Sequence, residues 1–189
     1  TGKMGYAIAK IASRRGAEVT LVSGPTAEAA PAFVNVVNVR SAQEMFEAVK
    51  ERAQEQDVII KAAAVADYRS KHVSAEKMKK TEDPSGMTLE LERTDDILAY
   101  LGENKRQGQF LCGFAMETEN LIANAKRKLE KKHLDMIAAN SLRVEGAGFG
   151  GNTNVVTVIT KEKEVSLGKM TKEETATELL TMIAEARKV

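Results

Sequence analysis

The sequence predicts an α/β protein with a mostly parallel β-sheet and helices on both faces of that sheet. Short apolar or alternating segments recur along the chain, and amphipathic segments of helical length separate them. Parallel strands need long crossover connections, which pack on the faces of the sheet. One stretch, residues 68–93, departs from this rhythm, and we expect it to project from the sheet as an arm.

The chain opens on a helix pattern rather than on a strand. Apolar residues recur at helical spacing from Met4 to Ala12, and Gly16 is a natural stop. A strand and a glycine-rich turn normally precede such a helix in α/β folds. We therefore expect residues 1–189 to form one domain that also has an N-terminal strand and loop in the complete protein.

The other elements follow in order along the chain. A serine or threonine followed three residues later by glutamate, a capping box, opens two helices at Ser41 and Thr171. Helices are predicted over 42–53, 94–103 and 120–132, and from residue 171 onward. Strands are predicted where short runs are continuously apolar or alternate, over 17–23, 33–39, 57–62, 87–93, 109–114, 134–140, 154–160 and 164–167. The last two should form an antiparallel hairpin at an edge of the sheet.

Composition narrows the function classes. The net charge of +1 argues against a general nucleic-acid binder, which needs a broad basic surface, so any anion site must be local. No apolar run is long enough to span a bilayer. The single cysteine, Cys112, excludes an internal disulfide and fits a reducing, cytoplasmic environment.

Ligands bind outside the carboxyl ends of strands in open α/β sheets, which makes strand exits the candidate sites. Four exits carry unusual residues: "KAAAVADYR" (61–69), "TDDIL" (94–98), "GFAME" (113–117) and "AANS" (138–141). At the first exit, small alanines would let a ligand approach the backbone, and Asp67 could bind a cation or a hydroxyl. The alternative is that the alanines pack beneath a helix and Asp67 caps a turn.

Two groups of lysines could bind an anion. Lys77, Lys79 and Lys80 lie in the segment "VSAEKMKK" (73–80), which the core does not need. A polyphosphate is neutralised by two or three cations, often with a metal ion, although a solvated face would look the same in sequence. In the predicted helix 120–132, Lys128 and Lys132 share one face and could reach the same anion.

Phe114 and a glycine-rich loop also admit two interpretations. Phe114 ends a very apolar strand, so it either packs in the core or stacks on an aromatic base. The motif "GAGFGG" (146–151) matches the dinucleotide-binding pattern, but a strand rather than a helix follows it. We interpret it as a loop.

Several motifs, in order and along essentially the whole chain, resemble the phosphopantothenoylcysteine synthetase family of coenzyme A biosynthesis. They are "GKMGYAIAKIASRRGAEVTLVSGP", "AAVADYR", "EKMKK", "DDIL", "GFAME" and "AANS". The resemblance implies a Rossmann-like fold and a ligase that joins 4'-phosphopantothenate to L-cysteine through an acyl-cytidylate. It implies CTP as co-substrate and Mg2+, a homodimer formed through the arm, and a flavin-dependent decarboxylase fused or associated upstream. Neither nucleic acid nor a membrane is expected as a partner.

The resemblance also assigns site residues. Nucleotide contacts fall on Lys61, Ala62, Ala63, Asp67, Lys77, Asp95, Asp96, Ile97, Leu98, Phe114, Lys128 and Lys132. Lys77 is also the expected catalytic residue and Asp67 the expected metal ligand. Substrate contacts are expected at Gly2, Lys3, Ala63 and Ala64. Two alternatives remain at this point, a nicotinamide-dependent reductase on a similar sheet and a non-catalytic nucleotide-binding module.

Overall fold

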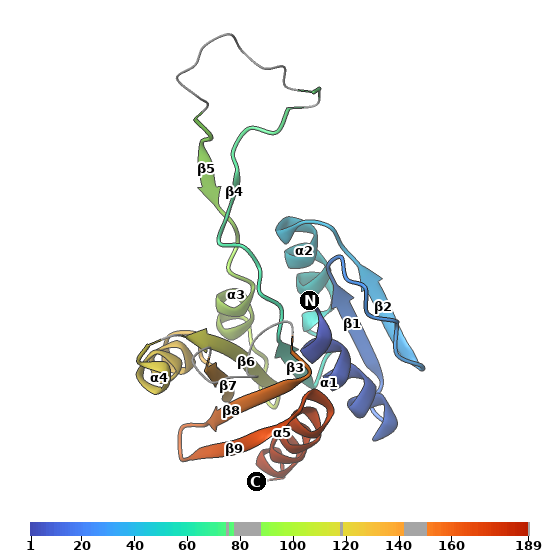
Figure 1. Ribbon diagram of the computed structural model, residues 1–189, viewed down its shortest axis with the longest axis vertical. Helices are drawn as coiled ribbons and strands as arrows, with labels where there is room; N and C mark the ends of the chain where they lie inside the picture. Colours follow the sequence, from blue (N-terminus) through green and yellow to red (C-terminus); the bar gives the residue numbers. More distant parts are fainter. Residues whose placement is uncertain (75, 78–87, 118, 142–150, 189) are drawn as a thin grey trace.

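The main sheet has five strands in the order β3-β6-β7-β8-β9 (Figure 1). The computed structural model describes residues 1–74, 76–77, 88–117, 119–141 and 151–188. β3 (Val58–Lys61), β6 (Phe110–Glu117) and β7 (Met136–Ser141) are parallel, whereas β8 (Thr153–Ile159) and β9 (Glu164–Thr171) continue the sheet as an antiparallel hairpin. The predicted α/β class, the mostly parallel sheet and the terminal hairpin are confirmed.

A second sheet lies beside the first and is not paired with it. β1 (Val19–Ser23) and β2 (Val34–Asn38) form a parallel pair of their own. Among the described residues, β1 pairs only with β2, and β3 pairs only with β6. In the described part of the chain, β1 and β3 each therefore have one edge without a partner strand, and a cleft lies between the two sheets.

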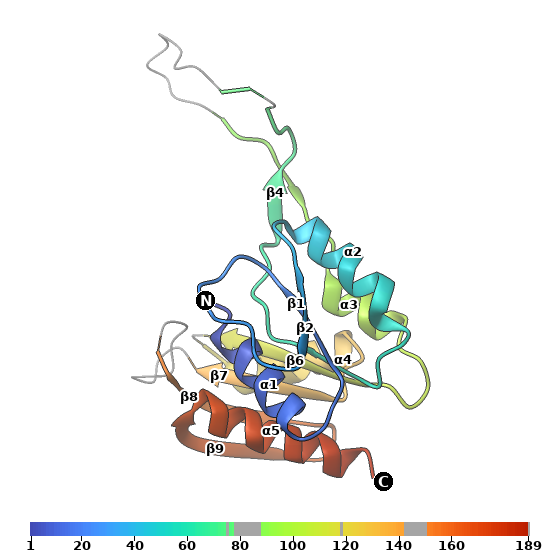
Figure 2. The same cartoon turned by 90° about the vertical axis from the view of Figure 1, so that its right-hand side faces the viewer.

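Helices cover both faces of the main sheet because its strands alternate their side chains. Cys112 and Met136 point to one face, where they pack with Leu179 of α5 (Lys172–Ala186) and with α1 (Lys3–Arg14). Their neighbours Leu111 and Ile137 point to the other face and pack with α3 (Ile97–Glu103) and α4 (Leu121–Lys131). The ribbon seen from the side shows α1 and α5 lying together on one face (Figure 2).

The helix starts follow the predicted caps, with one exception. Ser41 accepts a hydrogen bond from the backbone N–H of Glu44 at the start of α2 (Ala42–Ala53), and Thr171 and Glu174 form a full capping box at α5. The helix predicted from residue 94 begins only at 97, since Thr94 donates from its N–H and hydroxyl to the carbonyls of Asp67 and Ala66.

No helix in the described ranges is long and apolar enough to cross a bilayer.

Two strands run further than predicted. β6 continues from Phe114 to Glu117 because β7 offers it partners as far as Ser141. β9 continues to Thr171, the cap of α5, because β8 pairs with it along its whole length. Pairing with a neighbour thus extends a strand beyond its apolar run.

The arm leaves the body as a two-stranded antiparallel ribbon of β4 (Tyr68–Ser70) and β5 (Leu91–Arg93), and its described part projects away from the sheets (Figure 1). The strand predicted over 87–93 is therefore short, with residues 88–90 outside it and residue 87 outside the described ranges. β4 was not predicted. Tyr68 and Leu91 are each more than half exposed, so the ribbon has no core of its own.

Candidate functional site

A cleft of about 1820 Å³ separates the two sheets. β1 and α1 form one wall, and the edge strand β3 forms the other. At the carboxyl ends of β3 and β6 the cleft is lined by residues of all four predicted strand exits. The cleft is therefore where ligand binding is expected in an open α/β sheet.

Four charged residues from three separate segments, β3, the start of α3 and α4, meet in this cleft. Lys132, which caps the end of α4, places its Nζ 2.6 Å from Oδ2 of Asp96, which caps the start of α3. Lys128, one turn earlier on α4, donates from Nζ to the carbonyl of Phe114 over 3.3 Å. Lys61 ends β3, and its ammonium lies within electrostatic range of Lys128, Lys132 and Asp96. Three cations thus lie together near the carboxylate of Asp96, and Asp67 also lies within electrostatic range of Lys61.

The pKa values reflect this crowding. Burial lowers the pKa of Lys61 below its usual 10.5, and the positive charges of Lys128 and Lys132 lower it further. The pKa of Asp96 is lowered as well: burial alone would raise it, but the hydrogen bonds from Lys132 and from the backbone of Ala99 hold it below 3.8. The shift therefore favours the charged form of Asp96, whereas it disfavours the charged form of Lys61. The ligand-free cluster has an excess of positive charge, which suits an anionic ligand.

The start of α3 contributes through its backbone and its acidic cap. Asp95 is exposed and lines the cleft, and Asp96 accepts a 3.0 Å hydrogen bond from the N–H of Ala99. Ile97 and Leu98 also border the cleft, but their side chains are 3% and 1% exposed in the core. Any contact that these two make with a ligand must therefore come chiefly from the main chain.

The first strand exit also lines the cleft. Ala62 packs against the core around α5, whereas Ala63, Ala64 and Asp67 are exposed. Within the described ranges, no group of three or more His, Cys, Asp or Glu side chains could hold a metal ion. A lone carboxylate at Asp67 fits Mg2+, which proteins commonly bind through one or two carboxylates together with substrate phosphates.

Phe114 is half-buried, and its stacking on an aromatic base stays a prediction. It packs partly against the core near α5, and it also lines the cleft with part of its ring exposed. Gly113 before it is crowded: a side chain there would come within 2.9 Å of Leu134 and 3.0 Å of Leu98. This close packing fixes the strand that presents Phe114.

Two of the expected site residues, Lys3 and Lys77, do not line the cleft. Gly2, with φ 74°, caps α1 and lines the cleft, but Lys3 next to it bonds Asn152 and is not among the lining residues. Lys77 is exposed beyond β4 and does not line the cleft either. Lys79 and Lys80, like residues 146–150 of the glycine-rich loop, lie outside the described residues.

Sequence reasoning missed a buried polar group on the far side of the cleft. Asn154 and Lys172 line it and are hydrogen-bonded to each other, and Asn140 lies beside them. The strand exit "AANS" contains Asn140, so the sequence did indicate this residue as part of a candidate site. Asn154 within a strand and Lys172 at a helix start carry no local signal, because alternating polar residues in strands and lysines in helices usually face solvent.

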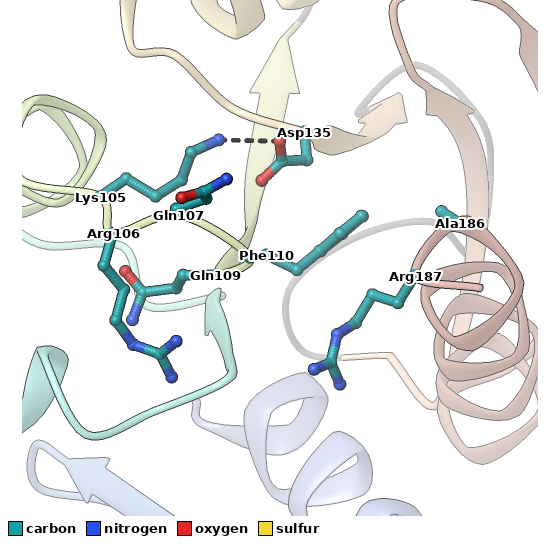
Figure 3. Close-up of a pocket in the computed structure, with 9 residues that line it drawn as sticks. Lys105, Arg106, Gln107, Gln109, Phe110, Asp135, Ala186 and Arg187 are labelled. Atoms are coloured by element: carbon teal, nitrogen blue, oxygen red, sulfur yellow. Dashed lines mark hydrogen bonds and ion pairs between the residues drawn. The ribbon is translucent and has the colours of Figure 1, made fainter. Parts of the chain in front are cut away.

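A second, smaller pocket of about 470 Å³ lies near the amino end of β6 and the end of α5 (Figure 3). Its charged groups are largely matched: Lys105 pairs with Asp135 at 2.7 Å, and Arg106 pairs with Asp57 at 2.9 Å. Asp135 also accepts from the backbone N–H of Leu111. These contacts tie loops together, so this pocket is not a candidate site.

Comparison with known proteins agrees with the sequence motifs. Residues 1–186 match the "DNA/pantothenate metabolism flavoprotein C-terminal domain" family. The coenzyme A biosynthesis bifunctional protein CoaBC of Bacillus subtilis is 46% identical over 190 residues, which are 100% of this chain and 46% of that protein. The chain thus spans about half the length of the curated relatives it matches.

Two solved structures extend the comparison. The crystal structure of the C-terminal domain of CoaBC matches with a TM-score of 0.81 and 46% identity, over 97% of this chain and 81% of that one. A Cab2 H337A mutant in complex with phosphopantothenate-cysteine has a TM-score of 0.62 at 16% identity, over 81% of this chain and 54% of that one, and shows the shared fold alone. By the match along nearly its whole length and by its identity to CoaBC, the chain belongs to the DNA/pantothenate metabolism flavoprotein C-terminal domain family.

Proposed function

We propose that this protein is a phosphopantothenate–cysteine ligase that uses CTP. In the first step, a carboxylate oxygen of 4'-phosphopantothenate attacks the α-phosphorus of CTP, and pyrophosphate leaves. In the second, the amine of L-cysteine attacks the acyl carbon of the acyl-cytidylate, loses a proton and expels CMP. The convergence of Lys61, Lys128 and Lys132 on one end of the cleft is the observation that carries the proposal.

The reaction suits a site of this kind. Both substrates of the first step are anions, so the protein must hold them together against their mutual repulsion and stabilise the charge that moves onto pyrophosphate. The cations at the ends of β3 and α4 would contact the triphosphate, and the exposed part of Phe114 would stack on cytosine. Asp67 would hold Mg2+, which neutralises phosphate charge when it is bound.

The acyl substrate would lie beside the nucleotide. Gly2, Ala63 and Ala64 leave room for the pantothenoyl chain, and Lys3 stands next to Gly2 at the start of α1. Lys77 is exposed outside the cleft of the single chain. A catalytic Lys77 therefore requires its segment, from this chain or from a second copy, to close over the nucleotide.

The same proposal includes partners. The arm exposes apolar side chains at Tyr68, Val73, Leu89 and Leu91, which would be covered if two arms paired in a homodimer. The curated relatives are described as bifunctional and are about twice as long as this chain. A flavin-dependent decarboxylase, fused or associated, would supply the second activity.

The test is release of pyrophosphate from CTP upon addition of 4'-phosphopantothenate, followed by formation of phosphopantothenoylcysteine upon addition of cysteine. Replacing CTP by ATP tests the choice of base. Protection against thermal unfolding by each nucleotide reports binding independently of turnover, since a ligand of the native state raises its stability. Protection by NADH and not by CTP, without release of pyrophosphate, would favour a reductase and contradict the proposal.

A further inference from the structure

The buried polar group opposite the lysine cluster contains a lysine whose charge is poorly compensated. Lys172 is the first residue of α5 and only 8% exposed. Its ammonium donates a 2.7 Å hydrogen bond to Oδ1 of Asn154, which is itself 4% exposed. Among the described residues, no carboxylate lies within ion-pair distance of Lys172. A neutral amide oxygen is its partner, although buried charges are normally paired with opposite charges.

Nearby positive charge further disfavours the charged form of Lys172. Burial lowers the pKa of Lys172, and the positive charge of Lys3 lowers it further. Lys172 also occupies the first turn of a helix, where the partial positive charge of the helix end disfavours a cation. Two lysines and a helix start thus add positive potential here, because the carboxylates of the same turn are engaged elsewhere, Glu173 with Lys10 and Glu174 in the capping box.

The surrounding residues hold this ammonium in a fixed position. Asn154 also donates from Nδ2 to the sulfur of Met4 in α1, over 3.1 Å. Asn140, 5% exposed on the adjacent strand β7, accepts from the backbone N–H of Val155 through Oδ1. Met4, Asn140, Asn154 and Lys172 all line the cleft. An ordered cation and ordered amides are thus presented to the space that the proposed ligands occupy.

The position along the sheet separates this group from the lysine cluster. Lys61 lies on β3, whereas Asn140 and Asn154 lie on β7 and β8, two and three strands away. Adjacent strands are about 4.8 Å apart, so the strands that carry the two groups lie roughly 10 to 14 Å apart across the sheet. 4'-Phosphopantothenate is a linear molecule with an anionic group at each end. One end could bind at the lysine cluster and the other at the buried polar group.

We propose that Lys172, with Asn154 and Asn140, forms a second anion subsite of the cleft that binds a phosphoryl group. This inference rests on the proposed function, because the phosphoryl group is either the phosphate of 4'-phosphopantothenate or the terminal phosphates of CTP. Lys172 supplies the positive charge. The two asparagines position it and would form further hydrogen bonds with the phosphoryl group. Bound phosphate would supply the negative charge that the ligand-free protein lacks here.

The test uses thermal unfolding of the wild-type protein and of Lys172→Met, with 4'-phosphopantothenate, pantothenate, CTP, CMP and pyrophosphate as separate probes. Loss of a charge-assisted hydrogen bond should weaken the phosphoryl ligand by about 10- to 100-fold. If only protection by 4'-phosphopantothenate is lost, the subsite takes the substrate phosphate. If protection by CTP and pyrophosphate is lost while CMP still protects, it takes the terminal phosphates.

Controls distinguish a ligand site from a structural lysine. Lys172→Gln keeps a donor towards Asn154 but removes the charge, and it should lose the same protection. Lys169→Met, an exposed lysine three residues earlier on β9, should keep it. Unchanged protection by every probe in both Lys172 variants would overturn the subsite alone. Absence of protection in the wild-type protein would overturn the proposed function, and the subsite with it.

Discussion

Lys132 Nζ lies 2.6 Å from Asp96 Oδ2, and this ion pair joins the end of α4 to the start of α3 at the mouth of the cleft. The other oxygen of Asp96 caps α3 by accepting from the N–H of Ala99. One carboxylate therefore both starts a helix and neutralises one of three clustered lysines. The pair shows that packing of two helices, rather than a local motif, creates the charge pattern of the site.

Removing Asp96 separates its two roles. Asp96→Ala loses the helix cap and should destabilise the protein by about 1 kcal/mol, as measured by urea unfolding. Asp96→Asn keeps an acceptor for Ala99 and should recover most of that loss. Because the pKa of Asp96 lies below 3.8 in the folded protein, the contribution of its charge is present above that pH and is lost as the pH falls through the folded value. Equal stability of the Ala and Asn variants would show that the cap is unimportant.

Lys61→Met should stabilise the ligand-free protein at neutral pH. The folded pKa of Lys61 lies below the unfolded value of 10.5, so its charged form is penalised at any pH below the folded pKa. The penalty disappears as the pH rises from the folded pKa towards 10.5. The melting temperature of Lys61→Met should therefore exceed that of the wild type near pH 7, and the difference should shrink towards pH 10. A variant less stable than the wild type at pH 7 would contradict this account.

Lys128→Met and Lys132→Met should each weaken CTP binding by about 10- to 100-fold, the effect expected for one charge-assisted hydrogen bond. Isothermal titration gives the dissociation constants directly. Lys131→Met is the matched control, because Lys131 is exposed on the same helix and does not line the cleft. Equal weakening in all three variants would point to a general loss of positive charge instead of a nucleotide site.

Lys77→Ala should abolish formation of the acyl-cytidylate with little change in melting temperature, since the side chain is exposed in the ligand-free chain. Pyrophosphate release from CTP and 4'-phosphopantothenate measures this step. Lys163→Ala, at the exposed turn between β8 and β9, serves as the control. Normal turnover of Lys77→Ala would remove this residue from the mechanism.

Deletion of residues 70–92 should yield a monomer that keeps the fold of the body. The described arm contributes exposed side chains such as Tyr68 and Leu91 and none of the buried core. Light scattering gives the oligomeric state, and circular dichroism checks that helices remain. A truncated protein that is still dimeric would show that the arm does not hold the two copies together.

The regular part of the fold was predictable because periodicity and caps act locally. The helix 42–53 and the capping box at Thr171 agree with prediction, since adjacent residues determine both. The start of α3 was predicted three residues early, because Thr94 bonds to residues 66 and 67 of a distant segment. Such contacts leave no periodic signal in the sequence.

The candidate site could be predicted from the sequence only in part. Lys128 and Lys132 could be paired from helical spacing alone, and the structure places both in the cleft. Their encounter with Lys61 depends on strand order, which spacing does not give. Lys172 was missed because its burial depends on β8 and α1, which lie far from it in sequence. The assignment of these residues to CTP stays a prediction.

The double attachment of Thr94 has a mechanical consequence. The N–H and hydroxyl of Thr94 are hydrogen-bonded to the carbonyls of Asp67 and Ala66. They join the chain segment that enters the arm to the segment that leaves it, immediately beside the cleft. These hydrogen bonds couple the two chain segments at the base of the arm, so we expect a displacement of one segment to move Asp67 and Asp95 together. A movement of the arm, such as one caused by docking of a second copy, would therefore shift both carboxylates at the same time.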